Sequence, residues 1–227
     1  MSIPRAACCP RSDVDIEWQA AEEELLDALI DAAAVNVGDY FTIGVERTAA
    51  PPDRLGGSHR FRATATLAGR PFEAFMLDVG LRSDPINDYD TLTTSDLLSF
   101  AEVEPAHIRA IPLEQHIAEK LHAHTRRYGD DQPSSRAKDL IDLILMSELA
   151  PFEFGRLREA IVQLFDARAT HDVPASVPAP PRNWAPPYRA LSEEVGLDPD
   201  PAVGYRLVAT FLDPRPRRRA WPRALGR

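Results

Sequence analysis

Apolar and polar residues alternate in two stretches, 59–68 and 71–79, on either side of a glycine. Successive side chains of a β-strand point to opposite faces of the sheet. The alternation therefore predicts a β-hairpin that turns at Gly69-Arg70 and has one apolar face. Asp78 lies at an even-numbered position of the second stretch, so we expect it on the opposite, polar face.

A second predicted strand, 14–18, begins between two closely spaced aspartates, Asp13 and Asp15, in the sequence "RSDVDIEW". Asp13 and Asp15 are two residues apart, which places both carboxylates on one face, while Val14 and Ile16 point toward the core. Two carboxylates so close repel each other, and a divalent cation such as Mg²⁺, which prefers oxygen ligands, is the usual remedy. The alternative is an exposed acidic edge strand in which Asp13 is a turn residue.

Asp78 is the one charged residue within the apolar segment "FMLDVG". A buried carboxylate without a partner is energetically costly. If its strand lies beside 14–18, Asp13, Asp15 and Asp78 converge, and such a cluster can hold metal ions that activate an attacking oxygen. The alternative is that Asp78 ends a strand and caps a turn at Gly80.

The remaining pattern predicts an α+β protein. Helical periodicity marks 19–34, 112–127, 134–149, 155–168 and 202–212, and a short helix is expected at 94–100. Further strands are expected at 40–46 and 108–111, with a polar loop at 81–90. Residues 174–187 are rich in proline and indicate a linker or an arm on the surface. We expect two domains, 1–111 with the sheet and 112–227 with most of the helices.

Lysine is rare in this chain. Of 26 basic residues, two are lysines, Lys120 and Lys138, and both lie in predicted helices. Arginine does not replace lysine where a compact point charge is needed, so a binding role is one interpretation. The alternatives are that the two lysines are a chance remnant and that Lys138 forms an exposed pair with Asp142, four residues later.

Charge and composition exclude several classes of protein. The net charge of −9 argues against a broad basic surface for nucleic acid, although residues 215–227 carry six arginines. There is no run of about 18 apolar residues, so no membrane span is expected. Adjacent Cys8 and Cys9 form no disulfide framework, which suggests a reducing cytoplasm. His116, His122 and His124 lack zinc-site spacing, and we interpret them as surface or core residues.

These motifs together resemble known proteins. "RSDVDIEW" and "FMLDVG" resemble the catalytic core of the polymerase-β-type nucleotidyltransferases. "QHIAEKLHAHTR" followed by "SSRAKDLIDLILM" resembles the AbiEii family of nucleotidyltransferase toxins, which includes the mycobacterial MenT toxins. The resemblance extends over about residues 11–213. It implies a nucleotidyltransferase-type mixed sheet with flanking helices in 1–111, followed by the mostly helical region 112–227.

The resemblance also implies a function. It suggests a cytoplasmic bacterial toxin with a cognate antitoxin, which transfers a nucleotide from a nucleoside triphosphate to an acceptor such as tRNA with Mg²⁺ or Mn²⁺. Asp13, Asp15 and Asp78 match the family's metal aspartates. Matches in the helical region are Lys120, which would meet nucleotide phosphates, and Asp139, a catalytic residue, with Arg136 and Lys138 beside it at the nucleotide.

One family feature is absent from this sequence. In the family, a Gly-Gly or Gly-Ser turn that holds the triphosphate precedes the paired aspartates, and "MSIPRAACCP" contains no such turn. The sequence therefore also allows a catalytically impaired, N-terminally truncated member of the family, for which we expect poor transfer. A third reading is an unrelated acidic α+β interaction protein.

Overall fold

The computed structural model describes residues 13–38, 40–48, 58–81, 89–96, 100, 102, 104–128, 132–133, 136–149 and 153–213. The chain divides into two compact units, which we call the sheet unit, Met1–Asn87, and the helical unit, Asp88–Arg227. The α+β class predicted from the sequence is confirmed. The sequence predicted the boundary after residue 111, whereas the structure places it after Asn87. Residues 88–111 therefore belong to the helical unit and not to the unit with the four-stranded sheet.

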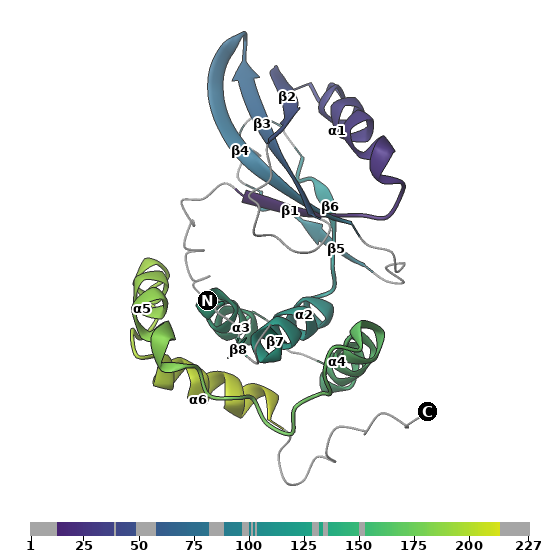
Figure 1. Cartoon of the computed structure of the whole chain (residues 1–227). Helices are drawn as coiled ribbons and strands as arrows, with labels where there is room; N and C mark the ends of the chain where they lie inside the picture. The colour runs from purple at the N-terminus through teal and green to yellow at the C-terminus, as the bar shows by residue number, and fades with distance from the viewer. Residues whose placement is uncertain are drawn as a thin grey trace. The chain divides into compact units, whose positions relative to one another are not determined.

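The sheet unit contains a four-stranded mixed sheet in the order β1-β4-β3-β2 (Figure 1). Its strands are β1 (Asp13–Trp18), β2 (Phe41–Arg47), β3 (Ser58–Leu67) and β4 (Arg70–Leu81). β1 runs parallel to β4, and the other neighbouring pairs are antiparallel. The predicted strand at 14–18 therefore lies directly beside the strand that carries Asp78.

The β3–β4 hairpin turns one residue earlier than predicted. Ala68 and Gly69 are the two turn residues, and both have positive φ, 50° and 77°. A two-residue turn whose twist matches the strands needs positive φ at both positions, and glycine supplies the second without strain. Arg70 is then the first residue of β4.

One face of this sheet is apolar and packs against α1 (Leu25–Ala33), which follows the short 3-10 helix η1 (Glu22–Glu24). The buried residues of this core are Leu25, Phe61, Ala63, Leu77 and Val79. The strand residues among them are those that the alternating pattern assigns to one face. Residues of opposite parity, including Asp15 and Asp78, are therefore directed to the other face.

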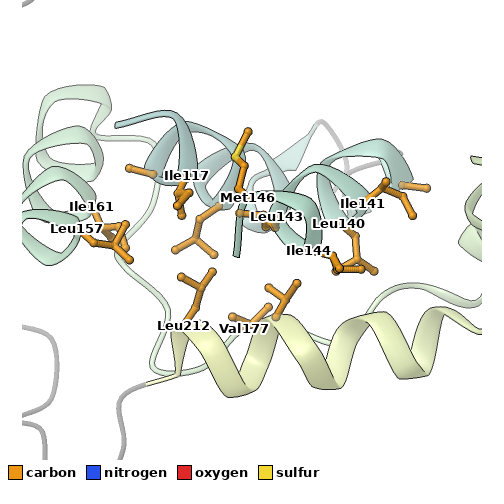
Figure 2. Packing of buried hydrophobic residues seen from close by; sticks show 14 of the residues in the cluster. Ile117, Leu140, Ile141, Leu143, Ile144, Met146, Leu157, Ile161, Val177 and Leu212 are labelled. Atoms are coloured by element: carbon orange, nitrogen blue, oxygen red, sulfur yellow. The ribbon is translucent and has the colours of Figure 1, made fainter. Parts of the chain in front are cut away.

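The helical unit begins with a hairpin, β5 (Asp90–Thr93) and β6 (His107–Ala110). Its other elements are α2 (Leu113–Thr125), β7 (Arg127–Tyr128), β8 (Gln132–Pro133), α3 (Ala137–Ser147), α4 (Phe154–Arg168), η3 (Arg182–Trp184), α5 (Ala185–Glu194) and α6 (Pro201–Leu212). Apolar side chains of these helices form one core, part of which is shown in Figure 2. Ile117 of α2, Leu140 and Leu143 of α3 and Ile161 of α4 are fully buried in it.

Two predictions in this unit need correction. In the expected short helix at 94–100, residues 94–96 are not helical, and Thr94 instead extends the hairpin by donating its backbone N–H to the Ala106 carbonyl. Residues 97–99 lie outside the described residues, and Phe100 has 3-10 helical conformation. The proline-rich segment 174–187 is not merely a linker or surface arm, because Val177 and Trp184 are buried in the core. Its last residues begin α5, which the sequence analysis missed because prolines within the first helical turn do not break a helix.

Gly204 lies where α6 packs closely against α5 and α3. A Cβ atom at this position would lie 2.2 Å from Tyr188 Oη and 2.8 Å from Ile144 Cδ1. Overpacking of this kind costs about 3 kcal/mol, and the better helix propensity of alanine returns about 1 kcal/mol. Gly204→Ala is therefore expected to lower the free energy of unfolding by about 2 kcal/mol, as measured by urea denaturation.

Gly155 of α4 provides a matched control, because a Cβ atom there would meet no atom within 4 Å. Gly155→Ala should be neutral or stabilising by up to about 1 kcal/mol. Combining Gly204→Ala with Tyr188→Phe removes the nearest clashing atom and should restore part of the loss. If Gly204→Ala is as stable as Gly155→Ala, the close packing of α6 on α3 and α5 is not as described.

Candidate functional site

The candidate metal-binding residues lie on the sheet face opposite to α1. Asp15 of β1 is the register partner of Asp78 of β4, so the two side chains leave the sheet next to each other. Arg60 of β3 is the partner of Asp78 on its other side. Three charged residues therefore form a row across three neighbouring strands, and the predicted juxtaposition of Asp15 with Asp78 is present.

Asp78 is held by a bidentate ion pair. Arg60 Nε donates a hydrogen bond to Asp78 Oδ1, and Arg60 Nη2 donates one to Oδ2, each at 2.6 Å. The Asp78 side chain is 10% exposed, whereas Asp15 is exposed. β4 continues to Leu81, so Asp78 lies inside the strand, and the interpretation that it caps a turn at Gly80 is wrong.

Two charged residues on this face, Arg60 and Glu17, were not among the predicted site residues. Glu17 follows Asp15 by two residues and is the register partner of Gly80. A Cβ atom at Gly80 would lie 3.3 Å from both carboxylate oxygens of Glu17, so glycine leaves room for this acid. The alternation of side chains along the strands could have identified both residues. Glu17 is two residues from Asp15 and shares its face, whereas Arg60 is next to Phe61 and points to the face opposite to it.

The carboxylate oxygens on this face are of the ligand type that divalent cations such as Mg²⁺ prefer. Mg²⁺ is commonly bound by one or two carboxylates together with substrate phosphates, and Asp15 and Asp78 are two adjacent carboxylates on one face. Asp13 pairs with Met76 through the backbone, but its side chain lies outside the described residues. Among the side chains that the structure describes, no three of His, Cys, Asp or Glu lie close enough together to hold a metal ion.

A second cluster of charged residues lies in the helical unit, between α2 and α3. Lys120 Nζ lies 2.7 Å from Asp142 Oδ2 and 3.7 Å from Asp139 Oδ1. Arg136 Nε lies 3.0 Å from Asp139 Oδ2. The structure thus brings together three of the predicted residues, Lys120, Arg136 and Asp139, and adds Asp142, which the sequence analysis considered only as a partner of Lys138. Lys138 is exposed in the first turn of α3.

Asp139 is the most deeply buried member of this cluster, with 0% of its side chain exposed. Burial raises the pKa of Asp139 above its ordinary value, while the nearby Arg136 and Lys120 charges act in the opposite direction. Neither carboxylate oxygen accepts a hydrogen bond of regular geometry from the described residues, although both cations lie within ion-pair distance. The carboxylate therefore depends on the charges of Arg136 and Lys120 for its stabilisation.

The three histidines of α2 are surface or core residues, as predicted. His116 is exposed, whereas His122 and His124 are buried. His122 contacts the Thr170 hydroxyl at 2.8 Å, and its ring packs edge-on against Phe165. These contacts join the C-terminal ends of α2 and α4.

The structure is that of an α+β protein with paired carboxylates on the open face of a mixed sheet and a lysine–carboxylate cluster in its helical unit. The family model for the nucleotidyl transferase AbiEii toxin of type IV toxin–antitoxin systems matches residues 12–225. The chain belongs to this AbiEii family of nucleotidyltransferase toxins, as the resemblance of its motifs predicted.

Among solved structures, the chain is similar to MenT4, a nucleotidyltransferase toxin from Mycobacterium tuberculosis H37Rv. The two are 18% identical, with a TM-score of 0.43, and the match covers 86% of this chain and 72% of that one. A search of curated proteins found no significant match. Membership of a toxin–antitoxin family implies a cognate antitoxin. Within the described part of the chain, no helix has the length and apolar character needed to cross a membrane.

Proposed function

We propose that this chain transfers a nucleotide from a nucleoside triphosphate to a hydroxyl group of an acceptor RNA such as tRNA, with Mg²⁺ or Mn²⁺ as cofactor. The observation that carries the proposal is the in-register pairing of Asp15 with Asp78 in a member of the AbiEii family. When bound, the cation would activate the attacking oxygen and stabilise the leaving pyrophosphate.

The residues of the sheet unit are proposed to hold the cation. Asp15 and Asp78 supply carboxylate oxygens from adjacent strands, and Asp13, two residues before Asp15 on β1, is proposed as the third ligand. Because the strand register fixes the backbone positions of Asp15 and Asp78 next to each other, we expect little backbone rearrangement when the cation arrives. Such preorganisation is a major source of transition-state stabilisation in enzymes.

The residues of the helical unit are proposed to neutralise phosphate charge. Lys120 and Arg136 carry the positive charges of the cluster, and Lys138 adds an exposed one on the same helix as Arg136. Asp139 is fully buried beneath them, so we assign it to orienting Lys120 and Arg136, with no direct contact with the substrate.

The proposal is tested with the four α-labelled nucleoside triphosphates, each incubated with the chain, total tRNA and Mg²⁺. Labelled tRNA is expected with at least one nucleotide, and Asp15→Asn and Asp78→Asn should each reduce the rate about 100-fold or more. Asp27→Asn, which neutralises an exposed acid of α1, serves as the control and should retain activity. Nucleotide binding without labelling of tRNA would instead favour the catalytically impaired form. The absence of both nucleotide binding and labelling would refute the proposal.

A further inference from the structure

The Arg60–Asp78 pair leaves the candidate metal site with less negative charge than its carboxylates suggest. Both Asp78 oxygens accept a hydrogen bond from the same guanidinium group. The Arg60 side chain is 25% exposed and that of Asp78 is 10% exposed, so solvent screens this pair only in part. Of the two described carboxylates that are proposed as metal ligands, Asp15 and Asp78, one is therefore already paired with a protein cation.

The geometry does not exclude a metal ion from Asp78. Each carboxylate oxygen offers two lone-pair directions, and the bidentate arginine uses one on each oxygen. Arg60 approaches from β3, whereas Asp15 lies on the opposite side, on β1. The effect of Arg60 on a bound cation is therefore electrostatic, and it opposes binding.

We propose that Arg60 is a built-in counter-ion that keeps the affinity of the Asp15–Asp78 site for free divalent cations low. The inference rests on the proposed role of these aspartates as metal ligands. A positive charge a few ångströms from a divalent cation weakens its binding about tenfold even at the dielectric constant of water, and more in a partly buried site. A site with this reduced negative charge favours a cation that binds together with a nucleotide, because the phosphates balance the cation charge that the protein leaves uncompensated.

Titration of the full chain with Mn²⁺ alone, followed by calorimetry, tests the proposal. Arg60→Gln removes the charge and keeps a hydrogen-bond donor, and it is expected to bind Mn²⁺ at least about tenfold more tightly than the wild type. Arg60→Lys keeps the charge and should stay within about threefold of the wild type. Arg70→Gln removes an exposed arginine at the start of β4, eight residues before Asp78, and serves as the control that should also change little.

A second measurement, the change in melting temperature on addition of Mn²⁺, keeps the test valid if the Arg60→Gln variant is less stable than the wild type. Without Arg60, the Asp78 charge has lost its main partner, so Mn²⁺ should raise the melting temperature of Arg60→Gln more than that of the wild type. Unchanged or weaker Mn²⁺ binding by Arg60→Gln would overturn the proposal, and so would an equal gain in Arg60→Lys. If Asp15→Asn does not reduce Mn²⁺ binding in either background, the metal site itself is refuted, which is a separate failure.

Discussion

Replacing Lys120 with methionine is expected to lower the free energy of unfolding by about 3 kcal/mol. Lys120 lies between Asp142 and Asp139, and the exposed fractions of these side chains are 17%, 17% and 0%. Removing one partner of a buried ion pair leaves an uncompensated charge, which costs about 3–5 kcal/mol, and partial exposure places this site at the lower end. Urea denaturation at pH 7 measures the effect.

Two further variants separate charge from packing at this position. Adding Asp142→Asn to Lys120→Met removes one of the stranded charges and should recover part of the lost stability. Lys138→Met removes the other lysine of the chain, which is exposed, and should change stability by less than about 0.5 kcal/mol. A stability of Lys120→Met equal to that of Lys138→Met would contradict the structural role of Lys120.

The stabilised double variant also separates folding from nucleotide binding. If Lys120 meets phosphates as proposed, Lys120→Met with Asp142→Asn should bind nucleoside triphosphates more weakly than Asp142→Asn alone, although both are folded. The sequence indicated for Lys120 only a role in binding nucleotide phosphates. The ion pairs give it a structural function as well, so activity loss in the single variant would not by itself identify a binding role.

Acidification is expected to destabilise the helical unit through His122. Burial, followed by the charges of Arg168, His171 and Arg126, lowers the pKa of His122 from 6.5 to about 4. The unfolded chain therefore binds a proton below pH 6.5 that the folded chain does not, and stability falls as pH decreases. This one group accounts for a loss of about 2 kcal/mol at pH 5 and about 3 kcal/mol at pH 4.

Other buried groups modify this pH dependence. Burial also lowers the pKa of His124 and His171, so both act in the same direction as His122. The raised pKa of Asp139 acts in the opposite direction, because the folded state takes up a proton there before the unfolded state does. The contribution of His122 must therefore be measured as a difference between variants.

The experiment compares the free energy of unfolding of the wild type and His122→Gln between pH 7 and pH 4.5. His122→Gln should be less stable at pH 7, because it loses the contacts with Thr170 and Phe165, but should lose about 2 kcal/mol less on acidification to pH 5. His116→Gln removes an exposed imidazole of the same helix and should keep the full acid dependence. Parallel pH profiles for wild type and His122→Gln would refute the assignment.

The sequence by itself determined the faces of the sheet. The period of two in 59–79 placed Phe61, Leu77 and Val79 on the core face and Asp78 on the other, as the structure shows. The same parity put Asp15 on the polar face of β1. These predictions succeeded because the direction of a strand side chain depends on its position in the strand, which is a local property.

Only the tertiary structure decided which charged groups meet. Arg60 reaches Asp78 because β3 and β4 pair in one particular register. Asp142 contacts Lys120, 22 residues away in the sequence, because α2 and α3 pack together. The buried position of Val177 and the glycine at position 204 likewise depend on neighbours far away in the chain. No local pattern contains such information, because the pairing of distant segments results from how the whole core packs together.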